Sequence, residues 1–350
     1  MSARLLPVSW TRAKIAYDVV LGVAVVGYLL AFLYLAPLLA DPNAPLDPPT
    51  LSLRAFGSLA FLLLTAALCI GPLARLDRRF LPLLYNRRHL GVVTFLVALA
   101  HAAEVLGWYF AFSPTPPLVA LLSSEPLAGP GHAPPFVPFG VVALLILFAL
   151  AATSHDFWLA YLGPTSWKWL HMAIYPAYAL VVAHVAWGYL QSSTGPVFPL
   201  VMLGSGGLVT GLHLAAARAG QRAEVVSAAQ DTGWLRVGPC DAIPEGRAVI
   251  LRPEVGDPIA VFRHAGRLVA VTNLCAHQNG PLGEGRILDG CITCPWHGFQ
   301  YRFEDGCAPP PYTERLATYP LRIEGRDVLV HPEPHPPGMP AEPVALPGSP

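Results

Sequence analysis

Charged side chains are scarce in this chain of 350 residues. They make up 13% of the sequence, against roughly 25% in an average soluble domain. Hydrophobic residues make up 54%, and the mean hydropathy is +0.48. This balance excludes a disordered chain, a nucleic-acid-binding protein and a soluble enzyme over the whole length.

The few charges are also distributed unevenly. Residues 1–220 contain 11 Lys and Arg and 7 Asp and Glu, a net charge of +4. Residues 221–350 contain 11 Arg and 15 Asp and Glu, a net charge of −4. A hydrophobic, slightly basic part therefore precedes a polar, slightly acidic one, which predicts a membrane domain followed by a soluble domain.

Six stretches of the first part are apolar enough to span a bilayer, for which about 20 largely apolar residues are needed. They are Val19–Ala40, Ala55–Ala74, Leu90–Phe112, Phe136–Ser154, Trp169–Tyr189 and Val197–Ala217. The first stretch is too long for the apolar core of a signal peptide. The alternative interpretation is six buried helices in a soluble protein.

Every second loop between these stretches lacks Lys and Arg, namely 41–50, 113–135 and 191–196. The loop between the second and third stretches instead holds Arg75, Arg78, Arg79, Arg87 and Arg88. Positive loops stay in the cytoplasm. We therefore expect a multi-pass protein of the inner (plasma) membrane, surrounded by lipid, with both termini in the cytoplasm.

Two of the predicted helices contain a pair of histidines each. His89 and His101 are 12 residues apart, or roughly 18 Å along a helix, and His171 and His184 are 13 apart, or roughly 20 Å. Polar side chains in lipid are costly and usually functional. Facing imidazoles at two levels predict bis-histidine haem sites, with His89 and His171 on the cytoplasmic side and His101 and His184 on the outer side.

The helical rotation argues against a single straight helix for the second pair. Thirteen residues rotate about 220° beyond three full turns, so His171 and His184 do not share one face. A kink at Pro176 would restore the register. The alternative is that these histidines only pack against other helices, and that His89 lies among the lipid headgroups. Glu104, one turn after His101, is a candidate proton relay or quinone contact, or else a carboxylate at the outer interface.

The surroundings of these histidines resemble a known family. Two helices of the ferric-reductase-like transmembrane family are resembled here. The third helix of that family is similar to Arg87–Gly91 (RRHLG) with Phe95 and His101. The fifth is similar to Trp169–His171 with Tyr175 and His184. The resemblance covers about residues 15–215 and implies a b-type cytochrome with six helices. It places haem ligands at His101, His171 and His184 and matches His89 more loosely, which leaves one or two haems.

The chain departs from this family after the membrane domain. Oxidase and ferric-reductase members continue into a flavin and nicotinamide domain, whereas no Gly-rich dinucleotide fingerprint occurs here. Instead, a linker at 218–231 leads to short alternating apolar runs separated by turn residues. These predict a small all-β domain over 232–332. A Pro-rich segment at 333–350 is expected to be a disordered tail, and residues 1–14 a cytoplasmic N-terminus.

Two loops of the β domain each supply one Cys and one His. Cys275-Ala276-His277 is followed after 16 residues by Cys294-Pro295-Trp296-His297. A [2Fe–2S] cluster with two thiolates on one iron and two imidazoles on the other needs this ligand set. The alternatives are a structural zinc site, which more often pairs Cys with Cys, and an unrelated scatter of the four residues.

The pattern around these four residues resembles Rieske domains. Gly280–Leu282 follows the first loop, Gly298–Tyr301 follows the second, and Gly306 with Pro309–Pro311 resembles the third, proline-bearing loop. The extra disulfide cysteines of the high-potential members are absent, and Phe299 replaces their serine donor. Tyr301 remains as a candidate donor to Cys275. Fewer hydrogen bonds to sulfur predict a potential at the low end of the Rieske span of roughly −150 to +300 mV.

Together these patterns predict a multidomain α + β protein, a six-helix transmembrane haem-binding bundle followed by an all-β Rieske domain. Electrons would pass from a cytoplasmic donor, a reductase or ferredoxin, through the cluster and haem b to a periplasmic or quinone acceptor. We find no facial triad, hydrolytic triad or other catalytic residues. Two alternatives remain, a haem-free anchored Rieske ferredoxin or redox sensor, and a terminal ferric or quinone reductase.

Overall fold

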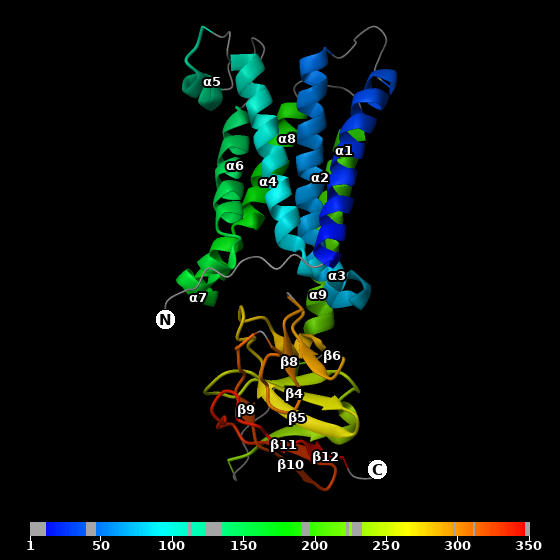
Figure 1. Ribbon diagram of the computed structural model, residues 1–350, viewed down its shortest axis with the longest axis vertical. Helices are drawn as coiled ribbons and strands as arrows, with labels where there is room; N and C mark the ends of the chain where they lie inside the picture. Colours follow the sequence, from blue (N-terminus) through cyan, green and yellow to red (C-terminus); the bar gives the residue numbers. More distant parts are fainter. Residues whose placement is uncertain are drawn as a thin grey trace. The chain divides into compact units, whose positions relative to one another are not determined.

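The computed structural model describes residues 12–39, 47–110, 114–123, 135–190, 197–221, 224–225, 233–296, 298–310 and 312–346 (Figure 1). The chain divides into two compact units. The first consists of Met1–Cys69 and Asn86–Thr210, and the second of Ile70–Tyr85 and Gly211–Pro350. The first unit is helical, and the second contains the β-sheets.

The described residues between 12 and 221 form mainly apolar helices. The helices are α1 (Arg12–Leu39), α2 (Pro48–Leu76), α3 (Leu81–Tyr85), α4 (Arg87–Glu104), α5 (Pro117–Ser123), α6 (Val137–Ala152), α7 (Asp156–His171), α8 (Ile174–Leu190) and α9 (Val197–Gln221). Among the described residues, five helices are long and apolar enough to cross a membrane. The fourth predicted span is α6, a shorter apolar helix of 16 residues.

The apolar side chains of these helices face both inward and outward. Leu64, Leu147 and Ala177 form a buried cluster between α2, α6 and α8. Val20, Val23 and other residues of α1 are well over half exposed. A long helix that exposes so many apolar side chains is expected where lipid, not water, surrounds it.

The fifth predicted span is interrupted by a turn of two residues. We expected His171 and His184 on one helix kinked at Pro176, but α7 ends at His171 and α8 begins at Ile174. Pro176 occupies the first turn of α8, where a missing N–H costs nothing, so the chain begins a new helix there. The hydrogen bonds from the Met172 N–H to Lys168 O and from the Tyr175 N–H to Met172 O cross the turn, so Thr165–Gly188 remains one apolar span with an irregular turn between its two histidines.

Three sheets are formed by the described residues of the β domain. The largest has the order β1-β3-β4-β5-β12, with β9 paired to β5. Its strands are β1 (Glu224–Val225), β3 (Ala248–Leu251), β4 (Ile259–His264), β5 (Arg267–Thr272), β9 (Thr318–Tyr319) and β12 (Val344–Ala345). The second sheet has the order β10 (Leu321–Glu324), β11 (Asp327–Val330) and β2 (Leu235–Pro239). The third consists of β6 (Arg286–Leu288), β7 (Cys291–Thr293) and β8 (Gln300–Arg302).

The central strand β4 supplies side chains to two separate cores. Ile259 and Val261 belong to one buried cluster, and Ala260 and Phe262 to the other. This follows from the alternation of side chains along a strand. The second core also contains Cys275, Cys294 and Tyr301, so the predicted cluster ligands extend from a packed apolar base.

The Pro-rich C-terminal segment is ordered as far as residue 346, and the expectation of a disordered tail there was wrong. Strand β12 pairs with β5 in antiparallel register, Val344 opposite Leu268. The Leu346 N–H donates to the Gly266 carbonyl at 2.9 Å, and the Leu346 side chain is buried in the first core. Prolines are compatible with an extended edge segment, and composition alone overlooked the apolar anchors. Residues 347–350 lie outside the described part.

We predict that Leu346→Ala loosens the edge of the main sheet, because deletion of buried methyl groups costs about 2 kcal/mol or more. Amide hydrogen exchange in peptides covering β5 of the full chain measures the effect, and faster exchange is expected. Val255→Ala, which shortens a side chain that is 87% exposed, is the matched control. Equal exchange in the two variants would contradict an anchoring role for Leu346.

Candidate metal centres

The two cysteine loops of the β domain share one hydrogen-bond pattern. The N–H of Cys275 donates to the carbonyl of Gly280 at 2.9 Å, and the N–H of Asn279 returns to Cys275 O at 2.6 Å. In the second loop the N–H of Cys294 donates to Phe299 O, and that of Gly298 to Cys294 O, both at 2.8 Å.

The fourth residue after each cysteine therefore occupies an equivalent position. There φ is +55° at Asn279 and +66° at Gly298, the left-handed region that Gly and Asn adopt most readily. The two loops are structural equivalents that present one sulfur each.

The two sulfurs approach each other because a glycine lies between the loops. A Cβ at Gly280 would lie 2.6 Å from the Sγ of Cys294. Both cysteines are almost fully buried. A hydrogen bond with the Cys294 thiol, then one with the Tyr301 hydroxyl, outweigh burial and lower the pKa of Cys275 to about 7. A thiol that ionises this readily suits a metal ligand, because the thiolate is the ligating form.

Tyr301 connects the first loop to the sheet. Its hydroxyl oxygen lies 3.3 Å from the Sγ of Cys275 and accepts the N–H of His277 at 3.2 Å. Because the oxygen already accepts a hydrogen bond, its proton is available to the sulfur. Burial, followed by the charge of Cys275, raises the pKa of Tyr301, which keeps the hydroxyl protonated.

The imidazole of His277 is partly exposed at the end of the first loop. It stacks on Phe299, with ring centroids 4.8 Å apart and planes within 9°. Tyr312, from the third loop, contacts the same Phe299 at 5.0 Å. Two thiols, one hydroxyl donor and one imidazole thus lie on adjoining loops, a donor set that fits a [2Fe–2S] cluster with mixed ligands. His297 and Pro311 lie outside the described residues.

In the membrane domain the structure brings together His101 and His184, the pair predicted to lie on the outer side. The ring centroids of His101 and His184 are 6.2 Å apart, with planes at 81°. The Nδ1 of His101 lies 3.0 Å from Leu53 O, and the Nδ1 of His184 lies 2.9 Å from Phe136 O. A carbonyl can only accept, so each Nδ1 carries the proton and each Nε2 keeps its lone pair for a metal.

Two glycines leave room for these rings. A Cβ at Gly57 on α2 would lie 3.0 Å from Cε1 of His101. A Cβ at Gly140 on α6 would lie 2.8 Å from Nδ1 of His184. Any larger residue at either position would push the ring aside. Sequence reasoning did not single out these glycines, because each one matters only through a histidine on another helix.

His171 and His89, the second predicted pair, differ from the first in their surroundings. His171 Nδ1 lies 3.0 Å from Trp167 O, its ring stacks on the Trp167 indole at 3.6 Å, and its buried Nε2 has no hydrogen-bond partner. That orphaned nitrogen fits a metal ligand. His89 Nδ1 lies 2.7 Å from the Asp18 carboxylate on α1, an arrangement also typical of ligating histidines. Asp18 and Trp167 were not predicted as site residues.

Glu104 lies at the end of α4, where a π-helical turn, Val105–Phe110, follows. The hydroxyl of Ser52 donates to its carboxylate at 3.2 Å. The next residue, Leu53, provides the carbonyl that receives His101. Two adjacent residues of α2, Ser52 and Leu53, therefore bond to Glu104 and to the predicted haem ligand His101.

Two models of known protein families match this chain. A model of the ferric reductase like transmembrane component matches residues 56–182, and a model of the Rieske [2Fe-2S] domain matches residues 233–320. The chain joins a ferric-reductase-like transmembrane domain to a domain of the Rieske [2Fe–2S] family. It is therefore a membrane protein of the electron-transfer type.

The curated relatives cover about a quarter of the chain. The 3-phenylpropionate/cinnamic acid dioxygenase ferredoxin subunit of Shigella flexneri serotype 5b (strain 8401) is 35% identical over 94 residues, 26% of this chain and 87% of the relative. The protein of the same description from Escherichia coli (strain K12) matches equally well. Among solved structures, the Sphingomonas yanoikuyae B1 ferredoxin is 30% identical, with 28% of this chain and 96% of that chain covered and a TM-score of 0.26.

We predict that Tyr301→Phe lowers the midpoint potential of the Rieske cluster. The variant removes one hydrogen bond to Cys275 Sγ, and such a bond stabilises the more negative, reduced state. A net hydrogen-bond contribution of about 1 kcal/mol corresponds to roughly 40 mV for one electron. A redox titration followed by electron paramagnetic resonance measures the shift. Tyr319→Phe alters another buried tyrosine of the domain and should leave the potential unchanged. An unchanged midpoint potential in both variants would refute a tuning role for Tyr301.

Proposed function

We propose that this protein passes electrons between a cytoplasmic [2Fe–2S] cluster and transmembrane haem b, toward an acceptor at the outer face or a quinone. The cluster ligands would be Cys275 and Cys294 on one iron and His277 and His297 on the other. The observation that supports the proposal most directly is the His101–His184 pair, 6.2 Å apart, in the same chain as a Rieske domain.

The spacing of this pair suits one metal ion between two imidazoles. Two metal–nitrogen bonds of about 2 Å each, added to the distance from each ring centre to its Nε2, give about 6 Å. The carbonyls of Leu53 and Phe136 fix the tautomer and the orientation of the rings. Haem and the cluster each accept and release one electron, so no acid, base or nucleophile is needed for the transfer itself.

The inner site would be held by His171 and His89. Trp167 orients His171 through both its carbonyl and its indole face. Asp18 orients His89 and places a negative charge beside it, which would favour the oxidised, more positive state of a bound metal. Two haems per chain would then form an inner and an outer level, and Glu104 near the outer level would serve proton movement to an acceptor such as a quinone.

The donor would be a soluble cytoplasmic reductase or ferredoxin. The arginine-rich loop at 75–88 and the Arg-free outer loops support a cytoplasmic location for the Rieske domain and both termini, and a location in the inner membrane. Electrons can pass in either direction between the cluster and the outer or quinone site. Whether the chain reduces ferric iron or a quinone without a partner is a further question that reoxidation of the purified protein answers.

A second function is favoured by one observation. The curated relatives are ferredoxin subunits of a dioxygenase, and the match covers 87% of their length. A membrane-anchored Rieske ferredoxin or redox sensor, without haem, would serve a cytoplasmic oxygenase or other partner through the same cluster.

A reduced-minus-oxidised visible spectrum of the purified chain, with haem quantified as its pyridine complex, separates these functions. Two haems b per chain support the transmembrane relay with four histidine ligands. One haem removes His89 from the ligand set. A chain with an intact cluster and no haem would overturn the relay and leave the anchored ferredoxin.

We further predict that His101→Ala and His184→Ala each remove one haem, and that the double variant loses no more than either single one. The reason is that both residues would hold the same iron. His213→Ala, on α9, removes a histidine outside the predicted sites and should retain the full haem content. Additive loss in the double variant would show that the two histidines bind separate groups.

A further inference from the structure

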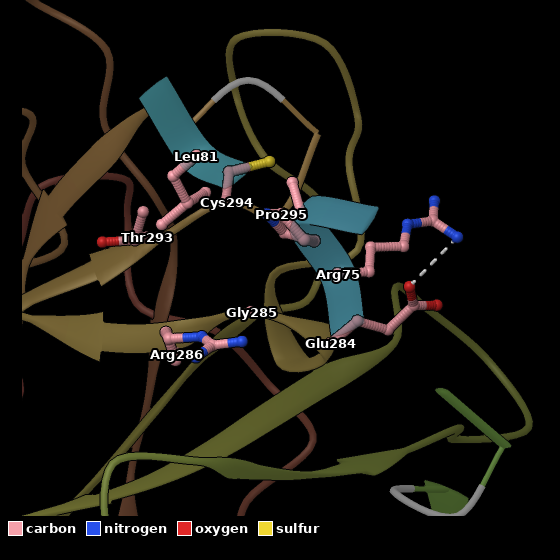
Figure 2. Close-up of a pocket in the computed structure, with 9 residues that line it drawn as sticks. Arg75, Leu81, Glu284, Gly285, Arg286, Thr293, Cys294 and Pro295 are labelled. Atoms are coloured by element: carbon pink, nitrogen blue, oxygen red, sulfur yellow. Dashed lines mark ion pairs between the residues drawn. The ribbon is translucent and has the colours of Figure 1, made fainter. Parts of the chain in front are cut away.

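The second unit contains a helical segment besides the β domain. This segment, Ile70–Tyr85, comprises the end of α2, a 3-10 turn at Arg78–Phe80, and α3. Figure 2 shows Arg75 of the segment reaching toward Glu284, with Nη1 and Oε2 3.7 Å apart. Glu284 lies in the turn that precedes β6, just after the first cysteine loop.

The charge of Arg286 acts on Asp77 of the segment, close to the first pair. The hydrogen bond from Arg79 is the main reason why the pKa of Asp77 is low, and the positive charge of Arg286 lowers it further. Arg75 and Asp77 are two residues apart, as are Glu284 and Arg286. Asp77 forms its ion pair with Arg79 of the same segment, so Arg75 and Glu284 are the ion pair that joins the segment to the β domain among the described residues.

The same contact reaches the second cysteine loop. Ala74 and Leu81 of the segment, both buried, line a small pocket together with Thr293, Cys294 and Pro295 (Figure 2). Cys294 is one of the two cluster cysteines. The helical segment therefore lies against the backbone that holds one of the iron ligands.

The sequence connects this segment directly to a haem-ligand helix. His89 follows Leu81 by eight residues, through α3 and the start of α4. Residues 81–89 thus connect a position beside Cys294 with His89, the candidate ligand of the inner haem.

We propose that Ile70–Tyr85 is the seat from which the Rieske domain exchanges electrons with the membrane domain, and that Arg75 and Glu284 are the positioning residues of this seat. The inference rests on the proposed function. Both side chains are about one-third exposed, so the pair adds little affinity. Its role is to select the register, because like charges across an interface are strongly disfavoured.

Charge reversal in the full-length holoprotein tests the seat. A one-electron pulse from photoreduced deazaflavin enters the cluster, and the rate of haem reduction is followed at the α-band. Arg75→Glu and Glu284→Arg should each slow this step about tenfold, and the double variant should return to within about threefold of the wild-type rate. Arg326→Glu is the matched control, because it breaks the Arg326–Asp241 pair of the same domain, 2.8 Å apart, and should leave the rate unchanged.

The outcomes distinguish the seat from the proposed function. Unchanged rates in both single variants, with transfer intact in the wild type, would overturn the seat alone. Absence of cluster-to-haem transfer in the wild type would overturn the proposed function. The cluster's paramagnetic spectrum and midpoint potential should stay constant in every variant, and a change in either would show a structural role and refute the positioning assignment.

A chemical test of the contact needs neither haem nor activity. In Arg75→Lys the new amine can form an amide with the Glu284 carboxylate when a carbodiimide takes up the water that is released. Mass spectrometry should find this cross-linked peptide in Arg75→Lys and not in Arg75→Lys combined with Glu284→Gln. Arg326→Lys, which would couple to Asp241, is the positive control for the reagent. A cross-link at 326 without one at 75 would refute the contact.

Discussion

The N–H of a histidine ring that is buried among apolar helices needs an acceptor within the protein, and the helical domain provides one for three of its histidines. Main-chain carbonyls meet Nδ1 in His101, His171 and His184. An N–H that donates to a carbonyl stays in place, which leaves Nε2 as the acceptor nitrogen of each ring. The helices that provide these carbonyls and the glycines that admit the rings are thereby held in register with the histidines.

In the Rieske domain the requirement is to hold two cysteines close together. Two loops repeat one backbone hydrogen-bond pattern, and each presents a cysteine from above a packed apolar core. Tyr301 joins the first loop to that core and contacts Cys275. The two cysteines thus lie within the packed core, while His277 at the end of the first loop is partly exposed.

The turn between α7 and α8 interrupts the helical span that carries His171 and His184. Within one helix, His171 and His184 could not face the same partner helix. The turn at Met172 and Ala173 interrupts this regular rotation, and each ring bonds to its own neighbour, Trp167 O in one case and Phe136 O in the other. Pro176 was recognised in the sequence as important, but as a kink rather than as part of a helix start.

Several features were determined by the sequence alone. The long apolar stretches, the alternation of arginine-rich and arginine-free loops, and the Cys and His spacing in two loops depend on residues near each other along the chain. They therefore indicated the membrane domain and the Rieske domain, including Cys275, Cys294 and Tyr301. Histidine positions suggested two levels in the membrane, but not which rings meet.

Only the tertiary structure paired His101 with His184, placed Asp18 beside His89 and Glu284 beside Arg75, and fixed Leu346 in the β core. Each of these contacts joins residues that are distant in sequence, and no periodicity or spacing records such a contact. Proline content suggested disorder at the C-terminus, but a single edge strand with one buried leucine was enough to order it. The physical reason is that the local sequence pattern determines elements and motifs, whereas packing between elements determines which side chains form a site.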